Sequence, residues 1–174
     1  MSFIELAKKR YTCRSYKETK VEKAKLDLII EAGHVAPTAA NKQPYQLIVV
    51  EGKEGLEKLS NAANIYHAPL AIIIYADAGA AWTRAYDGKK STDIDASIVT
   101  DHMMMEATDL GLASVWICGF KQNIVKKEFN IPDNMEVISI LAIGYEADEP
   151  QSPDRHSETR KPLNEIVTYY SLDK

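Results

Sequence analysis

The segment from Thr92 to Leu110 predicts one long helix that is apolar on most of its sides. Thr92 and Asp95, three residues apart, can cap its start, and Gly111 can end it. A helix of this kind needs other elements to cover it, because so much apolar surface is unfavourable in water. We therefore expect it to be the central, buried helix of the fold. Its two apolar faces are marked by Ile94, Ile98 and Met105 and by Val99, Met103 and Leu110.

Four short apolar runs predict β-strands at 47–50, 70–75, 114–118 and 137–143. The first two lack strict alternation of apolar and polar residues, which is typical of strands covered on both faces. Helical spacing predicts further helices at 3–10, 26–36, 53–63 and 123–129. Because helices and strands interleave without a repeat or a linker, residues 1–174 are expected to form a single domain of packed helices and strands.

Composition limits the function classes that the chain can serve. With 174 residues, 45% of them hydrophobic and 26% charged, the chain can bury a substantial core and is not expected to be disordered. Its net charge of -4 provides no overall basic field for nucleic acid or for an anionic membrane. No apolar run reaches the roughly 20 residues that span a bilayer, and the first residues lack a signal-peptide pattern. We therefore expect a cytoplasmic protein.

Two segments near the N-terminus indicate a site for a phosphate-bearing planar cofactor. Arg10 and Arg14 place two guanidinium groups within five residues, and guanidinium forks suit phosphate through charge-assisted hydrogen bonds. The segment 36–45 is a loop of small and amide residues that leads into an apolar run, so its backbone can approach the edge of a ring. The alternative interpretation is that the two arginines are solvated cations that close the first helix.

Other groupings of reactive side chains give weaker indications. His102 and Glu106 lie one helical turn apart, but such a pair is commonly a local polar contact and not a metal site. Cys13 and Cys118 are expected to be free thiols, since neither their number nor their spacing is typical of a disulfide framework or a zinc site. The glycine-rich dinucleotide and phosphate-loop fingerprints are absent, which disfavours a Rossmann dehydrogenase and a phosphate-loop kinase.

Several motifs, taken in chain order, give the sequence its resemblance to a known family. They are Arg10-x-Thr12-x-Arg14, the stretch from Ala36 to Tyr45, the stretch from Gly111 to Phe120, Ile143-Gly144-Tyr145 and Arg160-Lys161-Pro162-Leu163. In their order and spacing, between residues 3 and 168, the chain resembles the FMN-dependent nitroreductase family. The resemblance implies an α+β fold with a mixed central β-sheet flanked by helices, in an intertwined homodimer with two flavin sites at the subunit interface. It also implies a swapped C-terminal tail that wraps over the partner subunit.

The resemblance further assigns roles to individual residues around FMN. Arg10, Thr12 and Arg14 would hold the phosphate and the ribityl chain, and Arg160 would join them at the phosphate. A loop from the other subunit would line the flavin, while the end of the strand at 114–118 would pass close to the ring with its backbone amides. The loop residues are Pro37, Thr38, Ala39, Asn41 and Gln43, and the strand-end residues are Ile117, Cys118 and Gly119.

Some positions depart from the usual family pattern. Tyr11 stands in the cofactor-binding segment where a second arginine is common, and Cys118 stands where many members have glycine or glutamate. Either Asn61 or Asn64 would reach the pyrimidine edge of the flavin. The segment 79–91 is shorter than in members that fold helices over the flavin, so the sequence does not reveal the acceptor.

The implied activity is hydride transfer from NADH or NADPH to flavin N5, and from there to a small electrophile such as a nitroaromatic or a quinone. A single planar site implies ping-pong turnover, and no catalytic side-chain acid or base is required. Two alternatives remain open. One is a specialised enzyme of the same fold that dehalogenates, desaturates or cleaves flavin, and the other is a flavin-binding or regulatory protein with little turnover.

Overall fold

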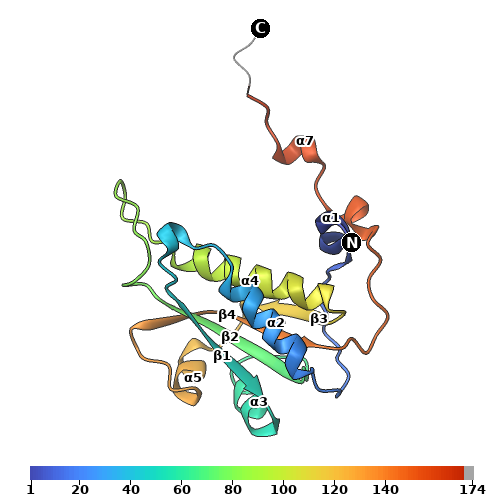
Figure 1. Ribbon diagram of the computed structural model, residues 1–174, viewed down its shortest axis with the longest axis horizontal. Helices are drawn as coiled ribbons and strands as arrows, with labels where there is room; N and C mark the ends of the chain where they lie inside the picture. The colour runs from blue at the N-terminus through green and yellow to red at the C-terminus, as the bar shows by residue number, and fades with distance from the viewer. Residues whose placement is uncertain (171–174) are drawn as a thin grey trace.

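In the computed structural model, which describes residues 1–170, a four-stranded sheet lies at the centre of the molecule (Figure 1). Its strand order is β1-β2-β4-β3. The strands are β1 (Tyr45–Glu51), β2 (Leu70–Asp77), β3 (Ala113–Ile117) and β4 (Met135–Gly144). The last four residues of the expected 1–174 domain lie outside the described residues.

The α+β class expected from the sequence is confirmed, and the four strands pair in an antiparallel manner throughout. Within residues 1–170, the parallel component of the expected mixed sheet is a single bridge between Thr12 and Ser114. Beside it, the backbone N–H of Cys13 donates to the carbonyl of Ser114 over 3.0 Å. The segment after the first helix therefore adds to the free edge of β3, which brings Arg10 and Arg14 alongside that strand.

The long helix α4 (Thr92–Asp109) packs with α2 (Lys23–His34) over one face of the sheet (Figure 1). Val99 and Met103 of α4 are completely buried there. A Cβ added at Gly33 of α2 would lie 2.9 Å from the Cγ of Met103, so the glycine allows the two helices to approach closely. The expectation of a central, buried helix is confirmed.

The predicted end of α4 is correct, but its predicted cap is not. Leu110 is the C-cap residue, and Gly111 follows with a φ of 75°, a left-handed value that glycine adopts without strain. At the start, the N-cap residue is Ser91, while the hydroxyl of Thr92 is buried without a hydrogen-bond partner. Asp95 accepts a hydrogen bond of 2.7 Å from the Ser91 hydroxyl. The predicted capping pair was therefore wrong by one residue.

The opposite face of the sheet is covered by α3 (Lys53–Ser60) and α5 (Gln122–Glu128) (Figure 1). Strand β2 contributes to the apolar clusters on both faces, as its sequence predicts. Strand β1 differs from the prediction, since most of its residues are only half-buried or exposed. The reason is its place at the edge of the sheet, where neighbours cover it less completely.

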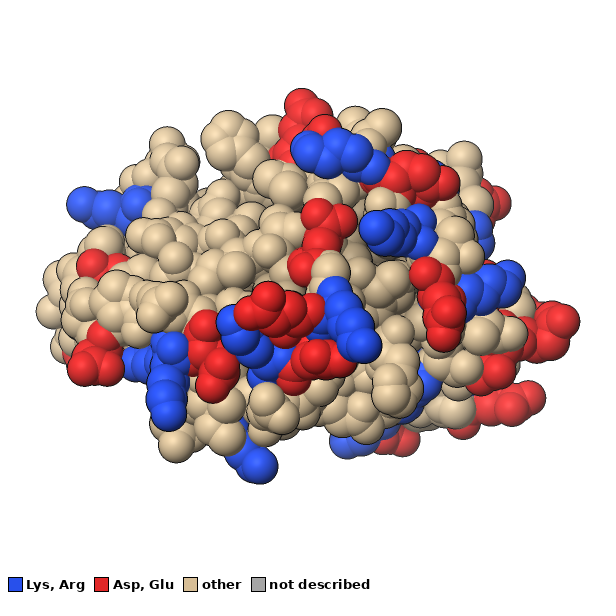
Figure 2. All heavy atoms as spheres, turned by 90° about the horizontal axis from the view of Figure 1, so that it is seen from below, with Lys and Arg blue, Asp and Glu red and all other residues tan. Residues whose placement is uncertain are grey.

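Charged side chains of both signs lie side by side on the face of the molecule drawn in Figure 2. That view looks from below Figure 1, and it shows no extended patch of a single sign. The pattern agrees with the modest net charge of -4. On this face, no broad electrostatic attraction for a polyanion is present.

The two ends of the described chain differ in how they are held. Helix α1 (Phe3–Lys9) begins with a capping box in which Ser2 and Glu5 exchange hydrogen bonds. Helix α6 (Arg155–Thr159) contacts the end of α1, whereas α7 (Leu163–Ile166) and residues 167–170 run away from the body (Figure 1). The exposed apolar side chains of this tail are Leu163, Ile166, Val167, Tyr169 and Tyr170.

Candidate functional site

A polar cavity of about 340 Å³ lies where α1, the segment after it and α6 meet. Four guanidinium groups line it, which is an unusual concentration of positive charge in a chain with a net charge of -4. The four residues are Arg10, Arg14, Arg155 and Arg160, and they are accompanied by Tyr11, Thr12, Gln151, His156 and Thr159.

Side chains of α6 fix this helix against the last carbonyl groups of α1. The guanidinium of Arg155 donates to the carbonyl of Lys8 over 3.2 Å and also to the carbonyl of Arg10. The Nε2 atom of His156 lies 3.3 Å from the same carbonyl of Lys8. Since the C-terminal carbonyls of a helix carry a partial negative charge, a guanidinium there is favourable. These contacts bring Arg160, at the end of α6, next to Arg10.

The guanidinium groups of the cavity repel one another. Burial lowers the pKa of Arg10, and the nearby charges of Arg155 and Arg160 lower it further. Asp101 acts in the opposite direction but more weakly. Within residues 1–170, none of the four arginines forms an ion pair with a carboxylate. An anion in the cavity would relieve this repulsion and accept charge-assisted hydrogen bonds, so the cavity is a candidate phosphate site.

The structure brings together the four predicted phosphate-site residues and adds residues that sequence reasoning missed, among them Arg155 and His156. Arg155 and His156 precede Arg160 by five and four residues, so one short helix places all three at the cavity. Only the spacing of four residues between His156 and Arg160 places two side chains on one helical face, so the sequence gives a weak signal for this group. The predicted residues that line the cavity are Arg10, Tyr11, Thr12, Arg14 and Arg160.

The loop of residues 37–43 lies at the other end of α4 (Figure 1). It contains the 3₁₀ turn η1 (Ala39–Asn41), and the N–H of Ala39 donates over 2.8 Å to Asp95 in the first turns of α4. Arg10 lies near the last turn of α4, since it lines a second cavity together with Thr108. Asp95 and Thr108 are 13 residues apart, or about 20 Å along the helix, so the loop and the arginines of one chain lie toward opposite ends of α4. A contribution of this loop from the other subunit stays a prediction.

The loop has an unusual backbone. Ala40, Asn41 and Gln43 have positive φ values of 50°, 52° and 48°, and this region costs a residue other than glycine about 1 to 2 kcal/mol. Thr38 helps to hold the conformation, because its hydroxyl accepts a hydrogen bond of 3.1 Å from the N–H of Gln43. Strained backbone that is held by its surroundings concentrates at ligand sites. Pro37, Asn41 and Gln43 are exposed, so the loop can contact a ligand or a second chain.

Replacing Asp95 with alanine should lower the free energy of unfolding by about 2 to 4 kcal/mol. The Asp95 side chain is 1% exposed and accepts from both Ala39 and Ser91, so its loss leaves two donors unpaired at about 1 to 3 kcal/mol each. Chemical denaturation measures the change. Asp93→Ala removes an exposed carboxylate from the same helical turn and should cost less than about 1 kcal/mol. Equal stability of the Asp95 variant and the wild type would contradict this account of the loop.

The end of β3 has accessible backbone. Ile117 is buried, whereas Cys118 and Gly119 are exposed, and a Cβ added at Gly119 would meet no atom within 4 Å. The guanidinium carbon of Arg14 lies 5.9 Å from the centre of the Tyr66 ring. The assignment of these strand-end residues to a flavin ring stays a prediction.

The two asparagines considered for the pyrimidine edge differ in their surroundings. The side-chain oxygen of Asn64 accepts a hydrogen bond of 2.9 Å from the N–H of Tyr66. Asn61 is the C-cap residue of α3. Neither observation places an asparagine at the pyrimidine edge of a flavin, so both assignments stay predictions.

The other side-chain groupings considered in the sequence lie outside the arginine cavity. No cluster of three or more potential metal ligands is present among residues 1–170, and Nδ1 of His102 lies 2.9 Å from the carbonyl of Ile98. Cys13 is a buried free thiol and Cys118 an exposed one. In the part of the chain that the structure describes, no helix is both long enough and apolar enough to cross a membrane.

Comparison with known proteins identifies the class to which this fold and site belong. The sequence model of the nitroreductase family matches residues 7–65 and 57–145. A crystal structure of a nitroreductase family protein from Clostridium difficile 630 is 58% identical, with a TM-score of 0.95, over 99% of this chain and 100% of that one. The chain therefore belongs to the nitroreductase family.

Two more distant relatives have names that mention a cofactor. An FMN-dependent nitroreductase from Clostridium difficile R20291 is 29% identical, with a TM-score of 0.82, over 97% of this chain and 99% of that chain. The FMN reductase (NAD(P)H) of Bacillus subtilis strain 168 is 29% identical and covers 90% of this chain and 73% of its own length.

Proposed function

We propose that the protein is an FMN-dependent oxidoreductase that transfers hydride from NADH or NADPH to a small electrophilic acceptor, such as a nitroaromatic or a quinone. The observation that carries this proposal is the cavity with four arginines and no neutralising carboxylate within the described residues. Membership of the nitroreductase family supports it. The names of the two relatives support FMN as the cofactor and NAD(P)H as the donor.

The residues present fit a flavin mononucleotide. Arg10, Arg14 and Arg160 would hold the phosphate, and Thr12 lines the same cavity. Cys118 and Gly119 offer accessible backbone groups to a ring. When bound, FMN supplies the chemistry itself, by accepting a hydride and passing two electrons to the acceptor.

The side chains of the protein would therefore bind and orient FMN, and their charges would set the electrostatic environment of its ring. Positive charge close to the ring stabilises the negative charge that hydride transfer develops there. Arg14 is suited to this second role, because its guanidinium is exposed and has no carboxylate partner within residues 1–170. No side-chain acid or base is required, and we assign no catalytic residue.

We also propose that the active form is a homodimer in which each site contains residues from both subunits. The loop with Thr38 and Asn41 lies near the start of α4, and the arginines lie near its end, so one FMN contacts both only if the loop comes from the partner. A groove of about 570 Å³ between α1, α2 and α4 is lined by Phe3, Val35 and Met105, among others. Phe3 and Val35 are both 68% exposed in the single chain. A second copy and its apolar tail would bury such surface, and permanent interfaces commonly exceed about 2,000 Å².

Initial-rate kinetics test the proposed reaction. If donor and acceptor use the same space in turn, plots of reciprocal rate against reciprocal NADH or NADPH concentration should be parallel at several nitroaromatic concentrations. Reduced protein freed of nicotinamide should still reduce the acceptor. Intersecting lines would contradict the ping-pong mechanism, because they require both ligands to bind together. Bound FMN without turnover would contradict the enzymatic proposal and favour a flavin-binding or regulatory protein.

A further inference from the structure

A short hairpin, residues 82–90, lies between β2 and α4. Thr83 and Lys90 form an antiparallel bridge, and the N–H of Gly88 donates to the carbonyl of Arg84 over 2.8 Å. Gly88 has a φ of 74°, a left-handed value that glycine adopts without strain. The hairpin is therefore an ordered element with its own hydrogen bonds.

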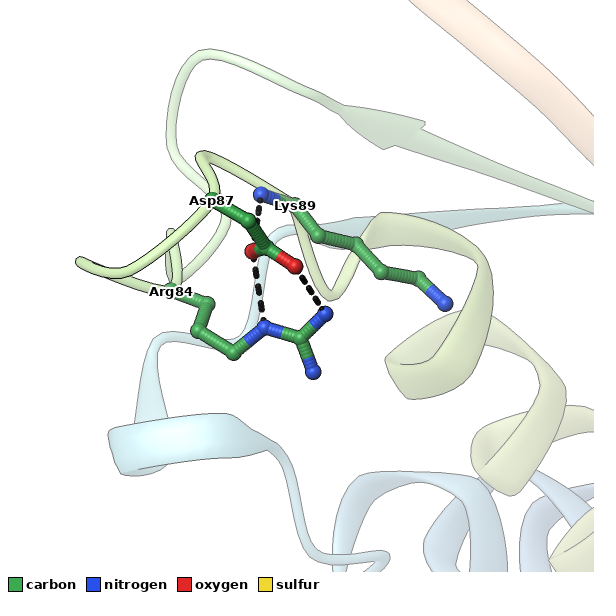
Figure 3. Close-up of polar contacts among 3 residues, drawn as sticks. All are labelled: Arg84, Asp87 and Lys89. Atoms are coloured by element: carbon green, nitrogen blue, oxygen red, sulfur yellow. Dashed lines mark hydrogen bonds and ion pairs between the residues drawn. The ribbon is translucent and has the colours of Figure 1, made fainter.

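Asp87 fixes the arginine of the hairpin in place (Figure 3). Its carboxylate accepts a hydrogen bond of 2.7 Å from Nε of Arg84 and a second one from a terminal guanidinium nitrogen of the same residue. It also accepts a bond of 3.1 Å from the backbone N–H of Lys89. The bond from Arg84 lowers the pKa of Asp87, so the carboxylate is ionised and the pair is formed at neutral pH.

The two lysines of the hairpin add positive charge that is not paired within residues 1–170. Neither Lys89 nor Lys90 has a carboxylate within ion-pair distance there. In Figure 3 the side chain of Lys89 extends away from Asp87. Residues 82–90 carry three cations and the carboxylate of Asp87, a net charge of +2 that is opposite in sign to the net charge of the whole chain and can attract an anion. Asp93 and Asp95 in the first turn of α4 partly offset this charge.

These cations border a small hollow of about 60 Å³ beside an exposed indole. Trp82 is 39% exposed and Ile94 is 52% exposed, so the hollow also has apolar walls. A flat aromatic surface next to ammonium groups suits a planar ligand that carries a negative charge. The residues that line the hollow are Trp82, Arg84, Lys89, Lys90, Ser91 and Ile94.

The buried carboxylate of Asp95 connects this hollow to the loop of residues 37–43. The N–H of Ser91 donates to the carbonyl of Trp82 over 2.9 Å, and the hydroxyl of Ser91 donates to Asp95 over 2.7 Å. The other oxygen of Asp95 accepts from the N–H of Ala39 over 2.8 Å. The hairpin and the loop therefore lie side by side, as Figure 1 also shows.

We propose that the hollow is a substrate subsite that receives the anionic group, a phosphate or a carboxylate, of a substrate with an aromatic ring. This inference rests on the proposed function, in which the neighbouring loop lines the flavin ring. Trp82 contacts the planar part of the substrate, and Lys89 and Lys90 stabilise its charge. The phosphate of FMN has a separate cavity at the arginines, so the hollow serves the substrate and not the cofactor.

The test is to remove both lysine charges in the FMN-loaded protein with the variant Lys89→Gln/Lys90→Gln. Two ratios of kcat/KM are measured at low ionic strength: para-nitrobenzoate against para-nitrobenzyl alcohol, and NADPH against NADH. At least one ratio should fall about tenfold, and the fall should shrink in high salt. A fall in the first ratio identifies a carboxylate of the acceptor, and a fall in the second identifies the additional phosphate of NADPH.

The matched control is Lys20→Gln/Lys53→Gln, which removes the same charge from two exposed positions outside the hollow and should change both ratios by less than about twofold. Unchanged ratios in the hairpin variant, or an equal fall in the control, would overturn the subsite. If that variant retains FMN and is reduced by NADH, the proposed function stands although the subsite is wrong. A wild-type protein that binds no FMN would contradict both.

Discussion

Replacing Arg10 and Arg14 together with alanine should weaken FMN binding by about 100-fold or more. Each guanidinium is expected to donate a charge-assisted hydrogen bond to the phosphate, and the loss of one such bond costs about 1.5 to 3 kcal/mol, or roughly 10- to 150-fold in affinity. The two residues line one cavity, so their losses are coupled and are not expected to add in full. Quenching of FMN fluorescence on binding measures the dissociation constant.

Two further variants separate the effect of charge from that of geometry. Arg10→Lys/Arg14→Lys keeps both charges but removes the planar fork, and should cost less than the alanine pair. Lys20→Ala removes an exposed cation that does not line the cavity and should leave the FMN affinity unchanged. Unchanged affinity in the alanine pair would restore the interpretation of the two arginines as solvated cations.

Mixed dimers should recover flavin binding from two variants that each lack it. One chain carries Arg10→Ala/Arg14→Ala and the other carries Thr38→Ala/Asn41→Ala, which changes the loop. If each site takes its arginines from one chain and its loop from the other, a purified mixed dimer has one intact site and should bind about half of the wild-type FMN. Differently tagged chains allow the mixed dimer to be isolated, and absorbance measures its flavin content.

The same experiment can give the opposite result. If each chain builds its own site, both sites of the mixed dimer carry one defect, and the flavin content stays as low as in the two parent variants. The separation of the loop and the arginines at opposite ends of α4 favours recovery. A wild-type protein that sediments as a flavin-loaded monomer would also contradict the shared site.

Elements whose signals are local in the sequence could be predicted well. The apolar pattern of α4 needs burial wherever the helix lies, and the sequence predicts it for that reason. The start of α4 could not be predicted to the residue, because the role of Asp95 depends on Ala39, which lies far away in the sequence. The antiparallel order of the sheet likewise depends on the path of the whole chain.

The candidate site was predicted in part for a similar reason. Arg10 and Arg14 lie close together in the sequence, and the resemblance added Arg160. Arg155 and His156 were missed because their place at the cavity depends on contacts between a five-residue helix and the carbonyl of Lys8. Helices this short receive little stability from their own hydrogen bonds, so sequence pattern alone indicates them weakly.

The central claim is that the protein holds FMN and passes electrons from a nicotinamide donor through it. The most direct test is the visible absorption spectrum of the FMN-loaded protein, recorded without oxygen while NADH and then NADPH is added. The account predicts that the oxidised flavin bands bleach with at least one donor and return when a quinone is added. A protein that takes up no FMN, or whose flavin stays oxidised with both donors, would contradict the claim.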